Sequence, residues 1–195
     1  PGARPAAASA YDKGVVSAAD PRAAEAGAEM LRAGGSATDA ALAVLVALTV
    51  VEPQSSGIGG GGFLIRDDGK GNVDSIDGRE TAPAAAHPRW FEMNGQFLSV
   101  PQAIPGGLSV GVPGNVALMA EAHRKYGRLP WKRLFEPAIR LAGDGFAVTP
   151  RFQNFLERFR PTRLPGADPY WAARGVAMSP ESRAIYYAPD GSPLP

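Results

Sequence analysis

Residues 52–65 have the sequence Glu52-Pro-Gln-Ser-Ser-Gly-Ile-Gly-Gly-Gly-Gly-Phe-Leu-Ile65, and residues 77–83 read Asp77-Gly-Arg-Glu-Thr-Ala-Pro83. The first segment offers a backbone that side chains do not crowd, and the second carries one guanidinium, that of Arg79. Unshielded backbone amides and a guanidinium both bind anions. Together the two segments predict a site for a small anionic molecule.

The four consecutive glycines at 59–62 also allow a purely structural interpretation, in which two backbones approach closely inside a sheet. A nucleotide site is disfavoured, because a P-loop needs a Lys-Ser/Thr pair and a helix after its last glycine. Here Phe63-Leu-Ile65 is typical of a strand instead. A dinucleotide fingerprint fails for the same reason.

Two helices are predicted before the glycines. Asp20-Pro21 supplies an N-cap and a first-turn proline for a helix that ends at Gly34-Gly35. Ser36-Ala-Thr-Asp39 is a capping box with Asp in place of Glu, and it opens the run Ala40–Val51, which is apolar on every face. A membrane span needs about 20 apolar residues, so we expect this run to form a buried central helix.

A hairpin is predicted after the glycines. Phe63–Ile65 and Val73–Ile76 flank the turn-rich segment Asp67–Asn72, which is typical of a connection between antiparallel strands. The glycines precede the first strand and Arg79 follows the second. Antiparallel pairing would therefore bring them to the same end of the hairpin, and the anion-site hypothesis depends on that geometry.

Further helices are expected downstream. One covers Asn115–Tyr126 and stops at Gly127. The face that we expect in the core consists of Val116, Met119, Ala120 and His123.

Two proline signals mark the next elements. Pro137 begins a new helical turn after Trp131–Phe135, and this helix runs to the break at Gly143-Asp-Gly145. Thr149-Pro150 starts another helix that stops before Pro161. The frequent prolines and glycines beyond Pro161 predict no clear element, and we interpret the chain as truncated or cleaved.

Arg79 is the candidate binding residue, because a guanidinium fork matches a carboxylate bidentately. A salt bridge to Glu80 or Asp77 explains an arginine at this position equally well. Hydroxyls near Arg79 come from Ser55, Ser56 and Thr81, although such residues in loops mostly cap the backbone. The two histidines, His87 and His123, are expected to have local structural roles.

Composition narrows the class of protein. The 195 residues are 45% hydrophobic and contain no cysteine, which excludes disulfides and cysteine metal sites. A formal charge of +1 gives no electrostatic footprint for nucleic acid. Without cysteine, and with neither histidine paired to a serine nucleophile, the usual catalytic pairs are hard to build from this chain alone.

Several motifs in order give the chain a resemblance to a known family. They are Gly14–Pro21, Ala33–Ala41, Glu52-Pro53, Ser56–Phe63, Arg79–Pro83, Gly111–Gly114 and Pro137–Phe146. In this order they resemble the gamma-glutamyltranspeptidase family, closely over about Val15–Thr149. The resemblance implies an α+β fold that forms part of an αββα N-terminal nucleophile hydrolase sandwich completed by a second chain. Residues 1–13 would then be a flexible lead-in, and residues 14–195 the N-terminal part of the large-subunit half of that domain.

The resemblance also implies a function. Relatives cleave gamma-glutamyl amides such as glutathione through an acyl-enzyme on a threonine at the start of the small subunit, with an amino acid or water as acceptor. Arg79 matches the arginine that contacts the alpha-carboxylate of the glutamyl group, and no catalytic residue, metal ligand or cofactor is expected in this chain. The implied partner is the small subunit from the same precursor, and the implied location is periplasmic, secreted or at a membrane surface. A catalytically silent homologue or fragment that binds or scaffolds remains the alternative, as does a related cephalosporin or poly-gamma-glutamate acylase.

Overall fold

A computed structural model of the chain describes residues 14–103, 107–158 and 180–193. These residues form two compact units. The first unit comprises the chain up to Glu80 together with Pro113–Phe146, and the second comprises Thr81–Val112 with the chain from Ala147 onward. Helices and strands both occur, so the α+β class predicted from the sequence is confirmed. The division into a lead-in and one domain part stays a prediction, and residues 1–13 lie outside the described residues.

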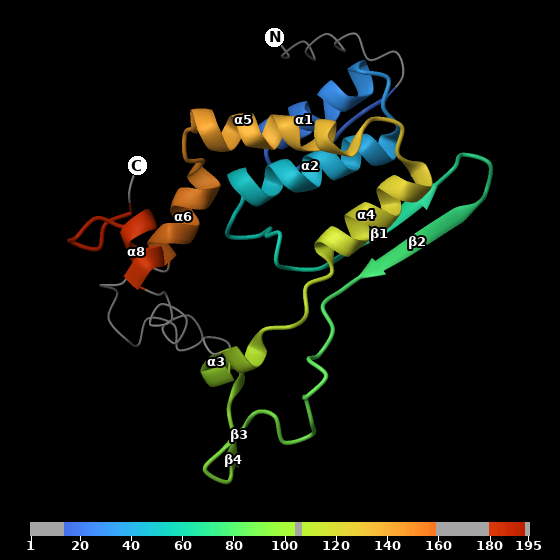
Figure 1. Cartoon of the computed structure of the whole chain (residues 1–195). Coiled ribbons are helices and arrows are strands. Elements are labelled where there is room, and N and C mark those ends of the chain that lie inside the picture. The colour runs from blue at the N-terminus through green and yellow to red at the C-terminus, as the bar shows by residue number, and fades with distance from the viewer. Residues whose placement is uncertain (1–13, 104–106, 159–179, 194–195) are drawn as a thin grey trace, which may run out of the picture. The chain divides into compact units, whose positions relative to one another are not determined.

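The first unit places a helical layer against a two-stranded sheet (Figure 1). Its elements are α1 (Pro21–Arg32), α2 (Ala37–Val51), β1 (Gly62–Asp67), β2 (Val73–Gly78), α4 (Asn115–Tyr126), η2 (Trp131–Phe135) and α5 (Glu136–Asp144). Strands β1 and β2 pair antiparallel, with Gly62 opposite Gly78. The expected hairpin is therefore present, and it brings the glycines and the residues after β2 to one end.

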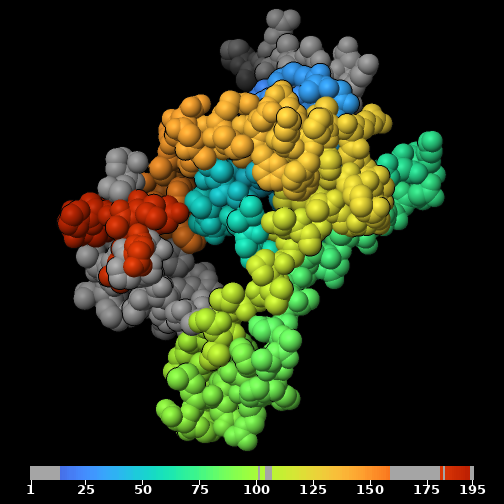
Figure 2. Space-filling model, viewed as in Figure 1, coloured from blue at the N-terminus to red at the C-terminus, as the bar shows by residue number. Residues whose placement is uncertain are grey.

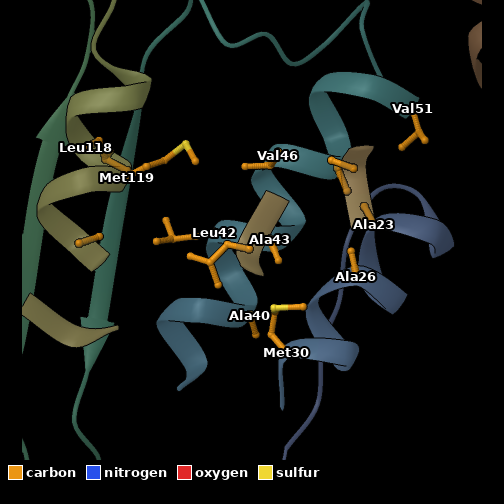
Figure 3. Packing of buried hydrophobic residues seen from close by; sticks show 14 residues of the cluster. Ala23, Ala26, Met30, Ala40, Leu42, Ala43, Val46, Val51, Leu118 and Met119 are labelled. Atoms are coloured by element: carbon orange, nitrogen blue, oxygen red, sulfur yellow. The ribbon is translucent and has the colours of Figure 1, made fainter. Parts of the chain in front are cut away.

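Helix α2 lies at the centre of this unit and contacts α1, α4, η2 and α5. Leu42, Ala43 and Ala47 are at most 1% exposed. Figure 3 shows Leu42 and Val46 on the side of α2 that faces α4, with Ala26 and Met30 of α1 on the other side. The prediction of a buried central helix is confirmed. Among the described residues, no helix combines the length and the apolar character needed to cross a bilayer.

A capping box fixes the beginning of α2, as the sequence predicts. The Asp39 backbone N–H donates to Ser36 Oγ at 3.1 Å, and Asp39 Oδ2 accepts from the Ser36 backbone at 2.7 Å. Asp39 is fully buried, and the same Oδ2 also accepts from the backbone N–H of Arg128 at 2.9 Å. One carboxylate thus starts α2 and holds the turn that follows α4.

The expected buried face of α4 is wrong by one position. Met119 is 2% exposed as expected, but Val116 is 49% exposed and Ala120 is also exposed. The buried residues of α4 are Asn115, Leu118, Met119 and Ala122. Both sets have the same i, i+3, i+4, i+7 spacing, and a shift of one residue turns a helix by about 100°. The set that is actually buried begins with the polar residue Asn115, so hydrophobicity alone did not identify it.

Polar contacts join α4 to the hairpin. The Tyr126 hydroxyl donates to Asp74 Oδ2, and Lys125 Nζ lies 3.4 Å from the same oxygen. The guanidinium of Arg66 lies 4.4 Å from the centre of the Tyr126 ring. The hydrogen bond from Tyr126 is the main cause that lowers the pKa of Asp74. These contacts hold the far end of α4 against both strands.

The remaining helical signals of the first unit are also confirmed. Helix η2 ends at Phe135, and α5 carries Pro137 in its first turn and ends at Asp144. Gly145 follows with φ of 77°, a conformation that favours glycine.

The second unit is built from short elements. Its described residues form β3 (Glu92–Met93), β4 (Gln96–Phe97), α3 (Val100–Ala103), η1 (Gly107–Ser109), α6 (Pro150–Arg158) and α8 (Pro180–Tyr186). The Phe152 backbone N–H donates to Thr149 Oγ1 at 3.1 Å, which confirms the N-cap predicted for α6. A small core of Phe152, Leu156 and Tyr187 holds α6 against the residue that follows α8.

Helix α1 begins at a partly buried ion pair. Asp20, which is 1% exposed, accepts from the Arg22 backbone and from Arg22 Nε, both at 2.8 Å, and from Nη2 at 2.6 Å. The guanidinium of Arg22 also lies 4.7 Å from the centre of the Phe146 ring. Hydrogen bonding to the Arg22 side chain lowers the pKa of Asp20, although burial partly opposes this shift.

Replacement of Asp20 tests this ion pair. Asp20→Asn keeps an N-cap acceptor but removes the charge. A lowered pKa in the folded state means that the pair stabilises the fold above the unfolded pKa of about 3.9. This stabilisation disappears as the pH falls through the folded pKa. We therefore expect Asp20→Asn to lower the free energy of unfolding at pH 7 by about 1.5–3 kcal/mol, and the loss to shrink at acid pH.

Urea unfolding at pH 7 and at about pH 3, below the usual carboxyl pKa, measures this difference. Asp144→Asn serves as the control, because Asp144 is exposed at the end of α5. An equal loss of stability at both pH values for Asp20→Asn would contradict the ion-pair account.

Candidate functional site

Three segments of the first unit meet at one end of the hairpin. They are the loop Gly57–Gly61, the residues Gly78–Glu80 at and just after the end of β2, and the start of α4 at Gly114–Asn115; we call them together the glycine corner. The backbone N–H groups of Gly114 and Asn115 both donate to the Gly60 carbonyl, at 3.1 and 3.0 Å. The loop is therefore fastened to the beginning of α4.

The close approach of these segments requires glycine at particular positions. A Cβ on Gly61 would lie 2.6 Å from the Gly78 carbonyl oxygen, and a Cβ on Gly114 would lie 2.1 Å from the same atom. Neither contact is tolerated by real side chains. At Gly59, by contrast, a Cβ would meet no atom within 4 Å. The structural interpretation of the glycine run is thus confirmed for Gly61, and the glycines lead into a strand and not into the helix of a P-loop.

Arg79 lies at the surface of the glycine corner, with 63% of its side chain exposed. Its Nη1 pairs with Glu80 Oε2, and its backbone N–H donates to Asp77 Oδ1 at 2.8 Å. The salt-bridge alternative is therefore observed. It uses one side of a guanidinium that carries five N–H donors, and Glu80 is its sole ion-pair partner among the residues that the structure describes.

This geometry leaves Arg79 able to bind a carboxylate. An exposed guanidinium presents a planar fork, which suits an anion with two oxygens. Glu80 limits the positions that the side chain samples, because a charge-assisted hydrogen bond holds Nη1. The corner can therefore orient a small molecule that carries a carboxylate.

A buried carboxylate, Glu52, stands where the loop begins. Glu52 is 2% exposed, and its backbone carbonyl accepts from the N–H groups of Ser55 and Ser56 at 2.9 Å each. Its Oε2 accepts from Gln54 Nε2 at 2.8 Å. The charge of Glu52 contributes to raising the pKa of Arg22, for which the hydrogen bond to Asp20 is the larger cause. An acidic residue directly after an apolar helix is the sequence signal for a buried carboxylate at this position. The sequence analysis did not predict that Glu52 is buried.

The histidines have the local roles that the sequence suggests. His123 Nε2 lies 2.8 Å from the Leu129 carbonyl oxygen, and its ring lies 5.3 Å from that of Trp131. His87 Nδ1 accepts from the Arg89 backbone N–H at 3.2 Å. Within the described ranges, no group of three or more acidic or histidine side chains is arranged to hold a metal ion.

The sequence predicted Asn115 only as the first residue of α4, but its side chain also joins the loop to this helix. Its Nδ2 donates to the Gly57 carbonyl at 2.7 Å, across 58 positions of sequence. An asparagine at the first position of a helix usually indicates only local capping. Nothing in the linear pattern connects it to a loop so far away.

Comparison with known proteins places the chain in a family. The gamma-glutamyltranspeptidase family model matches residues 23–192. The chain belongs to the gamma-glutamyltranspeptidase family. Glutathione hydrolase 3 of Arabidopsis thaliana is 51% identical over 140 residues, which cover 71% of this chain and 21% of that protein.

Two solved structures have a fold similar to that of this chain. The gamma-glutamyltranspeptidase of Helicobacter pylori matches with a TM-score of 0.79 and 31% identity, over 93% of this chain and 48% of its own. The transpeptidase CapD of Bacillus anthracis matches with a TM-score of 0.67 and 35% identity, over 93% of this chain and 51% of its own. Among the curated relatives compared, this chain spans from 20% to 29% of their length.

Substitution of Gly61 tests the packing of the glycine corner. A methyl group at Gly61 would press on the Gly78 carbonyl and on Glu80, so we expect Gly61→Ala to lower the free energy of unfolding by about 1–3 kcal/mol. Gly59→Ala is the matched control in the same loop, because a Cβ there has open space. Urea unfolding of both variants measures the difference, and equal stability of the two would refute the close-approach account.

Proposed function

We propose that this chain is the N-terminal part of the large subunit of an enzyme that cleaves gamma-glutamyl amides such as glutathione. The observation that carries the proposal is the exposed Arg79 fork at the glycine corner of a chain in this family. The names of its relatives give further support, because the Arabidopsis relative is called a glutathione hydrolase. No nucleic acid takes part in this function.

In the proposed complex, Arg79 binds the alpha-carboxylate of the gamma-glutamyl group. Glu80 holds Nη1, so the remaining N–H groups of the guanidinium are presented to the substrate. Binding at the alpha-carboxylate fixes one end of the glutamyl group and thereby sets the position of its gamma-carbonyl. Positioning of this kind reduces the entropic cost of the reaction.

The nucleophile of the proposed reaction is a threonine at the start of the small subunit, outside this chain. Its hydroxyl oxygen attacks the gamma-carbonyl carbon, while its own alpha-amine accepts the hydroxyl proton. The amide C–N bond then breaks and the leaving amine takes up that proton, which leaves a gamma-glutamyl ester on the threonine. Water or the amino group of an amino acid attacks this ester and frees the threonine. No cofactor is required at any step.

The hairpin offers a surface for the second chain. Phe63, Ile65 and Val73 are 67%, 76% and 66% exposed on its outer face, opposite the face that α4 covers. In Figure 2 the green end of the hairpin extends beyond the yellow surface of α4. Apolar side chains grouped in this way are typical of an interface. We propose that the small subunit, cut from the same precursor, covers them and completes the αββα sandwich, and that the enzyme is periplasmic or secreted.

Identification of the second chain tests this assembly. We expect the intact masses of the purified protein to show two polypeptides, and N-terminal sequencing of the smaller one to begin with threonine. A single polypeptide of 195 residues that stays folded and monomeric would contradict the two-chain proposal.

Replacement of Arg79 tests the substrate assignment in the assembled enzyme. Arg79→Lys keeps the charge but loses the fork, so we expect a cost of about 1.5–3 kcal/mol in substrate binding. This corresponds to a rise in KM for a gamma-glutamyl anilide of roughly tenfold to a hundredfold. Arg89→Lys is the control, because Arg89 is an exposed arginine paired with Glu92 in the second unit. An unchanged KM for Arg79→Lys would contradict the assignment of Arg79 to substrate binding. Substrate range is a separate test, in which turnover of a cephalosporin or of poly-gamma-glutamate in place of the anilide would indicate a related acylase.

A further inference from the structure

Asn115 is a buried amide whose hydrogen bonds go to a loop far away in sequence. Asn115 is 5% exposed. The backbone N–H donates to the Gly60 carbonyl at 3.0 Å, and Nδ2 donates to the Gly57 carbonyl at 2.7 Å. One residue therefore holds two carbonyls of the loop against the beginning of α4.

A short series of contacts leads from this loop to Arg79. The position of a Cβ on Gly61 lies 2.7 Å from Glu80 Oε2, so the loop backbone rests directly on that carboxylate. The same Oε2 pairs with Arg79 Nη1. Movement of the loop would thus displace the carboxylate oxygen that orients the guanidinium.

The side-chain oxygen of Asn115, Oδ1, argues against a role in stability alone. Its Oδ1 is buried and has no hydrogen-bond partner among the described residues. A buried acceptor without a partner destabilises the folded state. Selection for stability alone would favour a residue without this oxygen, such as alanine, which also has the higher helix propensity. The donor Nδ2 is the part of the side chain that makes a bond.

We propose that Asn115 is a positioning residue for Arg79, acting through the loop Gly57–Gly61 and Glu80. The proposal rests on the proposed function, in which Arg79 binds the carboxylate of the substrate. Asn115 itself does not touch the substrate. It restricts the positions available to the loop, and the loop restricts the carboxylate that holds the guanidinium.

Two variants of the assembled enzyme test this role. Asn115→Asp has nearly the same shape but no donor when its carboxylate is ionised, and Asn115→Ala removes both the donor and the unpartnered oxygen. For both we expect amide hydrogen exchange to rise about fivefold in peptides that span residues 57–62 and 78–80, as loss of one ordinary hydrogen bond predicts. We expect KM for the gamma-glutamyl anilide to rise about threefold to tenfold, with kcat changed less than about twofold.

The melting temperature separates positioning from general stabilisation. We expect Asn115→Ala to melt within about 2 °C of the native enzyme, because the lost bond is offset by removal of the unpartnered oxygen. Val116→Ala is the matched control on the next residue of α4, whose side chain is 49% exposed, and it should leave exchange and KM unchanged.

Three results would overturn the proposal. The first is unchanged exchange at residues 57–62 in both Asn115 variants. The second is faster exchange at residues 57–62 without any change at residues 78–80. The third is faster exchange at both segments with an unchanged KM of the Asn115 variants, while Arg79→Lys raises KM. Failure of the proposed function is distinguishable, because Arg79→Lys would then leave KM unaltered. The exchange at residues 78–80, which needs no substrate, would in that case decide the proposal for Asn115 by itself.

Discussion

Helix α2 has no polar face, and the first unit is organised by the need to cover it. Helices α1, α4 and α5 pack around it, and the inner face of the hairpin adds Leu64 and Ile76 to the same core. A buried carboxylate lies at each end of α2. Asp39 belongs to the capping box at its beginning, and Glu52 is the C-cap residue at its end, where the glycine loop starts.

The glycine corner follows from that arrangement. Burial of Leu118 against the hairpin leaves no room for a side chain on Gly78, because a Cβ there would lie 2.5 Å from the Leu118 Cβ. Helix α4 consequently begins against the loop and the end of β2. Arg79 is the first residue after this tightly packed position, and it emerges at the surface on a rigid support. An exposed side chain on a fixed backbone is well suited to bind a small molecule repeatedly in one orientation.

Much of this could be predicted because the signals are local. Capping residues, prolines and glycines located the helices, and the turn-rich segment at Asp67–Asn72 located the hairpin. The hairpin alone was enough to predict that Arg79 lies beside the glycines, since antiparallel pairing brings the two ends together. The buried face of α4 was not predictable in the same way, because two registers one residue apart satisfy the same spacing. Contact with α2 and the hairpin selects between them.

The sequence by itself determined the capped apolar helix, the hairpin and the place of Arg79, because each depends on residues close together in the chain. Only the tertiary structure decided the partner of the Asn115 side chain, and only the structure showed that Glu80, of the two neighbouring carboxylates, pairs with the Arg79 guanidinium. Asn115 bonds to a carbonyl 58 residues away, and no linear pattern encodes such a pair. The physical reason is that a buried polar group must take whichever partner the packing of apolar surfaces brings within reach.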